Sequence, residues 1–185
     1  LLRNNLGDKN IDFQQNKGFE LCESEGFFEE CIAEQTTINS LLKPIFKEAV
    51  FSTSENTFNF QKVHSKYIVN NFEGQIDTGK MACELLHKVQ KLGVKILNNI
   101  SVESFVGLDT SVEVKTDRIN FKTNKLFIAT NGFANQLLAE EVQPARAQVL
   151  ITKPIENLQI KGTFHLDKGY YYFRNIDNRI LFGGG

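Results

Sequence analysis

The sequence predicts a mixed α/β fold. Two stretches, residues 24–46 and 78–92, repeat apolar residues every three or four positions, as amphipathic helices do. Shorter apolar stretches, several of them with a period of two, surround these helices and are typical of strands. The second helix is followed by Gly93 and an apolar strand at 94–97, an order that forms half of a βαβ crossover. Helices and strands are therefore both expected to contribute to the core.

The composition is that of an ordinary globular protein. The chain has 185 residues, enough for one domain or two small ones, and 41% of them are hydrophobic. The net charge is −1 and the lysines are scattered singly, which argues against a nucleic-acid-binding or polybasic membrane surface. No apolar run is long enough to cross a bilayer. We therefore expect no nucleic-acid partner and no membrane span.

The three cysteines indicate reduced thiols rather than a disulfide framework. Cys22, Cys31 and Cys83 are odd in number, and none of them forms a C-x-x-C pair. This pattern predicts a cytoplasmic protein. The three histidines lie far from one another and from the cysteines in sequence, so no metal site is expected.

In residues 1–72, glycine, proline and capping residues mark the expected ends of the elements. Gly7 closes a short helix, and Ser24 precedes the long helix, in which Pro44 is expected to end the helix or to open a second one. The segment 50–60 can form a strand or an irregular loop. The predicted strands are 11–13, 18–22 and 67–69, of which the first two are expected to form a hairpin.

The helix expected at 78–92 has clear signals at both ends. Asp77 or Thr78 can accept a hydrogen bond as the N-cap, and Gly93 suits the position after the last helical residue. One stripe of apolar side chains is expected to face the core, and it consists of Met81, Leu85, Val89 and Leu92.

After residue 97 the apolar period changes to two and predicts a three-stranded antiparallel meander ending near residue 121. The continuous apolar run 126–129 is typical of a strand buried on both faces. This strand ends at Thr130-Asn131-Gly132, and ligands of open α/β sheets bind at such strand ends. A short helix is expected at 133–138. The remaining predicted strands are 147–152, 163–166, 170–176 and 179–182, with Asp177-Asn178 as the last turn.

The order of these segments resembles a known enzyme family. EGQIDTGK, a helix, LGVKIL, a meander, KLFIATNG, a short helix, VQPARAQVLIT and GYYYFRNIDNRILFGGG follow one another in the chain. This order is similar to that of the FAD-dependent oxidoreductases of the D-amino acid oxidase and glycine oxidase type, the DAO family. The similarity covers residues 67–185, and residues 1–66 fit more loosely. Each motif alone is weak, and the shared order supplies the context.

The resemblance implies a domain organisation and an activity. Residues 8–72 and 143–185 would form an antiparallel substrate-domain sheet with packed helices, and residues 73–142 would form a partial Rossmann-like FAD-binding domain. The activity would be oxidation of an amine or amino acid by hydride transfer to FAD, with the small-molecule substrate as the partner. The flavin would perform the chemistry while side chains position the substrate. No catalytic side chain is expected, which agrees with the absence of a catalytic dyad in the sequence.

The chain also departs from this family. Its members open with a strand–GxGxxG–helix unit that holds the FAD pyrophosphate, and no GxGxxG occurs here. They also end with a segment that contacts the flavin ring, and that segment would follow Gly185. We therefore expect an internal fragment that lacks the N-terminal GxGxxG segment, binds FAD weakly or not at all, and is inactive alone.

Two other functions remain open at this point. A dehydrogenase of the same fold would pass electrons to a quinone or carrier instead of oxygen. A cofactor-free binding or interaction domain is the other alternative, and the missing GxGxxG favours it.

The resemblance also assigns candidate cofactor-binding residues. Thr130, Asn131 and Gly132 match the family's Ala-Thr-Gly turn, which lies close to the dinucleotide. Val102 matches a position whose backbone commonly contacts the adenine. The alternatives are a structural turn for the first three and an ordinary half-buried strand residue for Val102.

Candidate substrate-binding residues lie near the C-terminus. Tyr170, Tyr172 and Arg174 alternate, so they share one face of the predicted strand. An arginine can bind a carboxylate through two parallel hydrogen bonds, and the family has a pocket-lining tyrosine nearest to Tyr170. The alternative is an exposed strand face with Arg174 paired to Asp177. His165 is a further candidate for the edge of the pocket.

Overall fold

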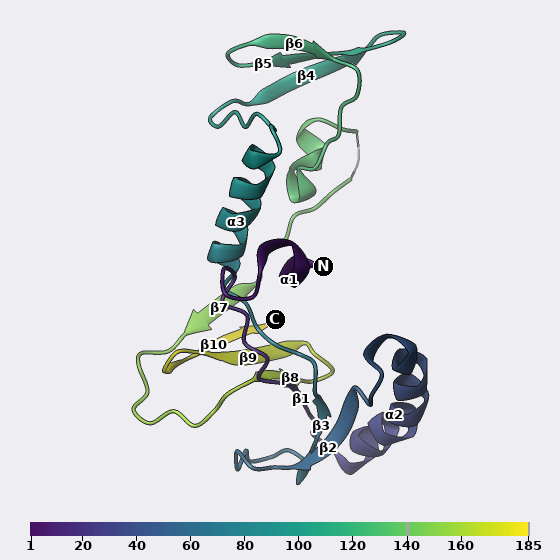
Figure 1. Cartoon of the computed structure of the whole chain (residues 1–185), viewed down its shortest axis with the longest axis vertical. Coiled ribbons are helices and arrows are strands. Elements are labelled where there is room, and N and C mark those ends of the chain that lie inside the picture. Colours follow the sequence, from purple (N-terminus) through teal and green to yellow (C-terminus); the bar gives the residue numbers. More distant parts are fainter. Residues whose placement is uncertain (140, 185) are drawn as a thin grey trace. The chain divides into compact units, whose positions relative to one another are not determined.

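The computed structural model describes residues 1–139 and 141–184, and Figure 1 shows the chain. The residues form two compact units. The first consists of Leu1–Lys88 and Ala147–Gly185, and the second of Val89–Arg146. Helices and strands occur together in the first unit, so the predicted mixed α/β class is confirmed.

The first unit contains a seven-stranded sheet with the order β2-β3-β1-β8-β9-β10-β7. All neighbouring pairs in it are antiparallel except β1 and β8, which are parallel. The sheet is therefore mixed rather than purely antiparallel. Its strands are β1 (Gly18–Leu21), β2 (Phe51–Glu55), β3 (Lys66–Asn70), β7 (Gln148–Ile151), β8 (Thr163–Leu166), β9 (Tyr171–Ile176) and β10 (Arg179–Gly184).

The predicted hairpin between 11–13 and 18–22 is wrong. Strand β1 pairs with β3 on one side and with β8 on the other, so both of its edges are already occupied. Residues 11–12 lie in a turn instead, although Ile11 is fully buried. The segment 50–60, left open between strand and loop, forms β2 and then a turn.

One face of this sheet carries an aromatic core. Phe164 in β8 is fully buried and stacks on Phe173 in β9, with ring centroids 4.6 Å apart, and on Phe19 in β1, at 4.9 Å. Phe58 and Phe60, from the loop between β2 and β3, close over these rings edge-on. The aromatic contacts therefore join β1, near the N-terminus, to β8 and β9, which are distant from it in sequence.

The opposite face is covered at one end by helix α2 (Glu25–Phe46), which packs against β2 and β3 (Figure 1). Ser24 caps it by accepting a hydrogen bond from the Phe27 N–H at 3.2 Å. The helix continues through Pro44 for two residues and ends with Lys47 in the left-handed region, at a φ of 66°. Pro44 therefore neither ends the helix nor opens a second one. A proline this close to the C-terminus removes only one hydrogen bond of the helix.

The other two helices begin and end as their caps predict. Helix α1 (Leu2–Leu6) ends at Gly7, which has a φ of 84°. Helix α3 (Thr78–Lys91) begins after Asp77, whose carboxylate accepts a hydrogen bond from the Lys80 N–H at 2.9 Å. No residue of α3 is buried, so its apolar stripe does not face a core as expected. No helix of the described residues is both long and apolar enough to cross a membrane.

The second unit contains the predicted meander of β4 (Val102–Gly107), β5 (Val112–Thr116) and β6 (Asn120–Thr123), followed by the 3-10 helix η1 (Asn131–Gln136). The strands predicted at 94–97 and 126–129 are not formed. An apolar run becomes a strand only when a neighbouring strand accepts its backbone hydrogen bonds, and no described segment does so here. Phe127 is 85% exposed as a result. The expected Rossmann-like segment therefore lacks its parallel strands within residues 89–139 and 141–146.

Replacing Phe164 by alanine tests the aromatic core. The change removes a fully buried ring together with its two stacked contacts, so we expect the free energy of unfolding to fall by about 3–5 kcal/mol. Urea unfolding measures this difference. Leu41→Ala on α2 is the control, because Leu41 is 72% exposed and its loss should change little. A Phe164→Ala variant as stable as the control would contradict the role of this core.

Candidate functional site

The sheet of the first unit places several polar side chains on the face opposite the aromatic core. His165 in β8 pairs with Glu20 in β1 and with Tyr172 in β9. Thr163 pairs with Arg174 in the same way. Because residues paired across neighbouring strands point to the same face, these five side chains share one surface.

Glu73, from the segment before α3, joins this surface. Its Oε1 lies 3.2 Å from His165 Nε2 and also accepts a hydrogen bond from the Thr163 hydroxyl. A Cβ atom at Gly18 would overlap the Glu73 carboxylate. Glycine at position 18 therefore leaves the space in which Glu73 reaches the sheet.

The charges of this cluster influence one another. The hydrogen bond that Glu73 accepts from His165 raises the pKa of His165, and the same bond lowers the pKa of Glu73. Burial raises the pKa of Glu20, and the nearby Glu73 raises it further, while His165 opposes both effects. The arrangement favours a His165 imidazolium paired with a Glu73 carboxylate.

Of the three candidate substrate-binding residues, the structure places two together. Tyr172 and Arg174 are two residues apart in β9 and share the polar face. Tyr170 lies in the turn before β9, where its ring meets Tyr171 edge-on at 4.9 Å. A Cβ at Gly183, the residue paired with Tyr172 in β10, would overlap the Tyr172 ring, so this ring lies over the glycine.

Arg174 lines a polar cavity of about 380 Å³. Its Nη1 donates a hydrogen bond to the Ile76 carbonyl at 3.0 Å, and within the described residues its guanidinium forms no ion pair, with Asp177 or with any other carboxylate. The other residues that line the cavity are Asp12, Gln14, Gln75, Ile76, Asp77, Thr78, Lys80, Ile176, Asp177 and Leu181.

Gln75, which lines this cavity, is held in place by Gln14. The residue is 7% exposed, and its Nε2 donates to Gln14 Oε1 at 3.2 Å, while its Oε1 has no hydrogen-bond partner in the described chain. Two backbone hydrogen bonds of 2.9 Å between Gln14 and Gln75 hold the two residues side by side. The Arg174 guanidinium suits a ligand that carries an anionic group.

The candidate cofactor-binding residues all lie in the second unit. Val102 begins β4 and is 38% exposed. Thr130 precedes η1, and its hydroxyl is buried without a hydrogen-bond partner among the described residues. Asn131 has a φ of 46°, and a Cβ at Gly132 would lie 2.9 Å from Pro144 Cβ. The unsatisfied Thr130 hydroxyl fits a contact with a polar ligand such as a dinucleotide.

The described residues do not fit the pyrophosphate of FAD. Such a group is held by free backbone N–H groups at a helix N-terminus that follows a glycine-rich turn. The N-terminus of α2 is capped by Ser24 and carries Glu25, and that of α3 is capped by the Asp77 carboxylate. A carboxylate at this position repels a phosphate, so neither of these two helix N-termini suits the pyrophosphate.

The remaining candidates serve other contacts. His64 and His87 pair with glutamates on helices, Glu25 at 3.0 Å and Glu84 at 3.5 Å. No group of three His, Cys, Asp or Glu side chains in the described ranges could hold a metal ion. The cysteines are free, and burial raises the pKa of Cys22 to about 12.

Comparisons with known proteins identify relatives of this arrangement. The family model DAO, described as "FAD dependent oxidoreductase", matches residues 5–185. No curated protein matches the chain. Solved structures with the same fold include L-proline dehydrogenase from P. horikoshii, with a TM-score of 0.72 and 20% identity over 99% of this chain and 52% of that one.

Two further structures are similar. Iminodiacetate oxidase from Chelativorans sp. BNC1 has a TM-score of 0.74 at 14% identity and covers 98% of this chain and 51% of its own. Glycine oxidase from Geobacillus kaustophilus has a TM-score of 0.69 at 15% identity. The match covers 100% of the present chain and 52% of the glycine oxidase chain. The present chain therefore spans about half the length of each of these proteins.

Replacing Glu73 by glutamine tests the ion pair with His165. We expect the pKa of His165 to fall toward its ordinary value of 6.5, as followed by NMR titration of the imidazole. Gly18→Ala should act in the same direction, because its methyl group displaces the carboxylate. Glu55→Gln, which removes an exposed partner of Lys66, is the control. An unchanged His165 pKa in Glu73→Gln would contradict the pairing.

The same pair makes stability depend on pH. The raised pKa of His165 gives stability that is complete below 6.5 and is lost as the pH rises through the raised value. The lowered pKa of Glu73 gives stability that is present above 4.5 and is lost as the pH falls through the lowered value. The stability difference between the unmodified chain and Glu73→Gln should therefore be largest between pH 4.5 and 6.5 in urea unfolding.

Proposed function

Because the chain belongs to the DAO family of FAD-dependent oxidoreductases, we propose that a protein containing it oxidises an amine or an amino acid. The chemistry that FAD would supply when bound to such a protein is the acceptance of a hydride from the substrate carbon. The observation that carries the proposal is the Arg174 guanidinium, which lines a cavity without a carboxylate partner among the described residues. A substrate carboxylate is a suitable partner for it.

Side chains of this chain orient the substrate. Arg174 uses one N–H on the Ile76 carbonyl, which fixes the guanidinium and leaves other N–H groups for the carboxylate. The Tyr172 ring, which lies over Gly183 on the same strand face as Arg174, and Tyr170, in the turn before β9, are further contacts in this proposal. These contacts bring the substrate into one orientation before the hydride leaves.

The domain roles are part of the same proposal. Residues 8–72 and 143–185 serve as the substrate domain, and residues 73–142 contribute to the FAD-binding domain. The buried Thr130 hydroxyl supports a cofactor contact there, together with Asn131, Gly132 and the Val102 backbone. The solved structures of this fold are named dehydrogenase and oxidase, so the proposal includes both oxygen and another electron acceptor.

Substrate binding by Arg174 is tested by Arg174→Lys in the FAD-loaded protein that contains this chain. We expect the Kd of an amino acid, measured by anaerobic flavin reduction, to rise about 10- to 100-fold, because lysine loses the paired hydrogen bonds to a carboxylate. The Kd of the matching amine without a carboxylate should stay unchanged. Arg179→Lys is the control, since Arg179 also donates to a backbone carbonyl, at 2.8 Å. Equal losses for both substrates would refute the carboxylate role.

Cofactor retention is tested with the 185-residue chain alone. Because its sequence has no GxGxxG turn to hold the pyrophosphate, we expect the 185-residue chain to bind FAD weakly or not at all and to show no oxidase activity. Titration with FAD, followed by flavin fluorescence, measures the affinity. A yellow, flavin-loaded preparation of this chain would overturn the prediction. A longer protein that contains the chain and also fails to bind FAD would instead favour the cofactor-free binding domain.

A further inference from the structure

Two of the three cysteines meet between the sheet and α2. Cys22 follows β1 and is fully buried in a core cluster with Phe28 and Ile68. Cys31, on α2, packs against the same cluster. Both thiols are free, and the Cys22 thiol donates a hydrogen bond to the Cys31 sulfur. Contact between two thiols is the first requirement for a disulfide bond.

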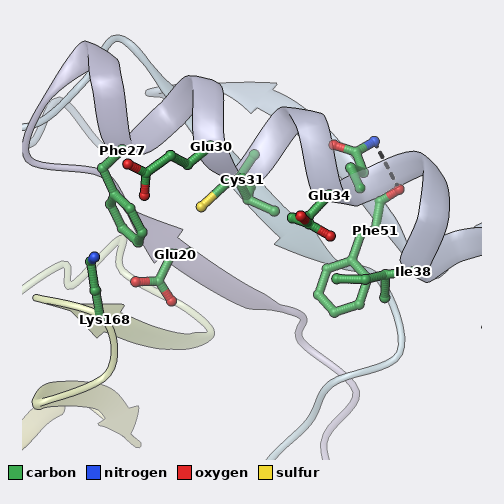
Figure 2. Close-up of a pocket in the computed structure, with 10 residues that line it drawn as sticks. Glu20, Phe27, Glu30, Cys31, Glu34, Ile38, Phe51 and Lys168 are labelled. Carbon is green, nitrogen blue, oxygen red and sulfur yellow. Dashed lines mark hydrogen bonds between the residues drawn. The ribbon is translucent and has the colours of Figure 1, made fainter.

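The two thiols differ in their access to small molecules. Cys31 lines a second cavity, of about 450 Å³, whereas Cys22 does not line it. Figure 2 shows the Cys31 side chain on the face of α2 that borders this cavity, between the side chains of Phe27 and Glu34. The cavity is much larger than the roughly 30 Å³ that one water molecule occupies in the liquid, so a molecule with two oxygen atoms fits easily. A small oxidant therefore reaches Cys31 first.

The surroundings of the two thiols make this reaction slow. Burial raises the pKa of Cys31, and the hydrogen bond from Cys22 lowers it, while the charges of Glu20 and Glu30 raise it and that of Lys168 lowers it. Burial raises the pKa of Cys22 to about 12, and Cys31 raises it further. Because only a thiolate is a nucleophile, oxidation is gradual, and the Cys22 hydrogen bond favours the negative charge on Cys31.

We propose that Cys22 and Cys31 form an intramolecular disulfide when hydrogen peroxide enters this cavity. The Cys31 thiolate attacks one peroxide oxygen, the O–O bond breaks, and the leaving hydroxide takes up a proton to become water. The Cys22 sulfur then attacks the sulfur of the Cys31 sulfenic acid. The S–S bond forms, the S–O bond breaks, and the hydroxide leaves with the Cys22 proton as a second water. Two thiols are oxidised and one peroxide is reduced.

The modification joins the end of β1 to α2, two elements of the first unit. Neither cysteine lines the Arg174 cavity, so the disulfide is separate from the proposed substrate site. Its formation requires no FAD, and its test is therefore independent of the proposed function.

The test is treatment of the purified chain with hydrogen peroxide, followed by alkylation of the remaining thiols, digestion after glutamate and mass spectrometry. Glu23, Glu25, Glu29 and Glu30 lie between the two cysteines, so digestion separates the cysteines unless a disulfide joins them. We expect a linked pair of peptides that is lighter than the two reduced peptides by two hydrogens and is separated by dithiothreitol. Its rate of formation should rise about tenfold per pH unit below pH 9.0, the ordinary pKa of a thiol.

Three variants separate the roles of the cysteines. Cys31→Ser should abolish the linked pair and leave Cys22 reduced, because peroxide does not reach a fully buried thiol. Cys22→Ser should stop the reaction at the Cys31 sulfenic acid, which dimedone traps. Cys83→Ser removes an exposed thiol and is the matched control, in which the linked pair should form at an unchanged rate.

Three outcomes in the unmodified chain would overturn the proposal, so it stays testable even where a variant fails to fold. The first is oxidation of Cys31 to the sulfinic acid without a linked pair. The second is a disulfide that joins Cys83 to either of the other cysteines in place of the expected pair. The third is no oxidation of Cys22 or Cys31 under conditions that oxidise the exposed Cys83.

Discussion

The parallel pairing of β1 with β8 is the interaction on which the rest of the first unit depends. It joins a strand near the N-terminus to one near the C-terminus, with Phe19 opposite Phe164 and Glu20 opposite His165. The first pair lies in the aromatic core, and the second pair lies on the polar face. Without this ladder the two halves of the sheet would have no common edge, and neither surface would exist.

Elements defined by local signals could be predicted from the sequence. Ser24, Asp77 and Gly93 mark helix ends, and the period-two pattern after residue 97 marks the meander. Elements that need a distant partner could not be predicted. The runs 94–97 and 126–129 have the composition of strands, but no described strand pairs with them. Residues 11–13 were expected to pair with β1, and β8 pairs with β1 instead. Strand formation depends on pairing as much as on composition.

The candidate site shows the same division. Alternation along one strand was enough to place Tyr172 and Arg174 on one face. Sequence reasoning missed Glu73, Gln75 and Glu20, because their importance comes from contacts with residues far away in the chain. The Gln14–Gln75 bridge has no local signal at all. A polar residue in a loop signals a functional role only when its partner is known.

The Glu73 carboxylate over Gly18 has a consequence for how this sequence can change over time. The Glu73 carboxylate fills the space that a side chain at position 18 would need. A larger residue at 18 is therefore tolerated only with a shorter one at 73. Losing the carboxylate also leaves Thr163 and His165 without their shared acceptor. In homologous sequences these four positions should therefore vary together, and a homologue with alanine at 18 should carry a different polar pair in β8.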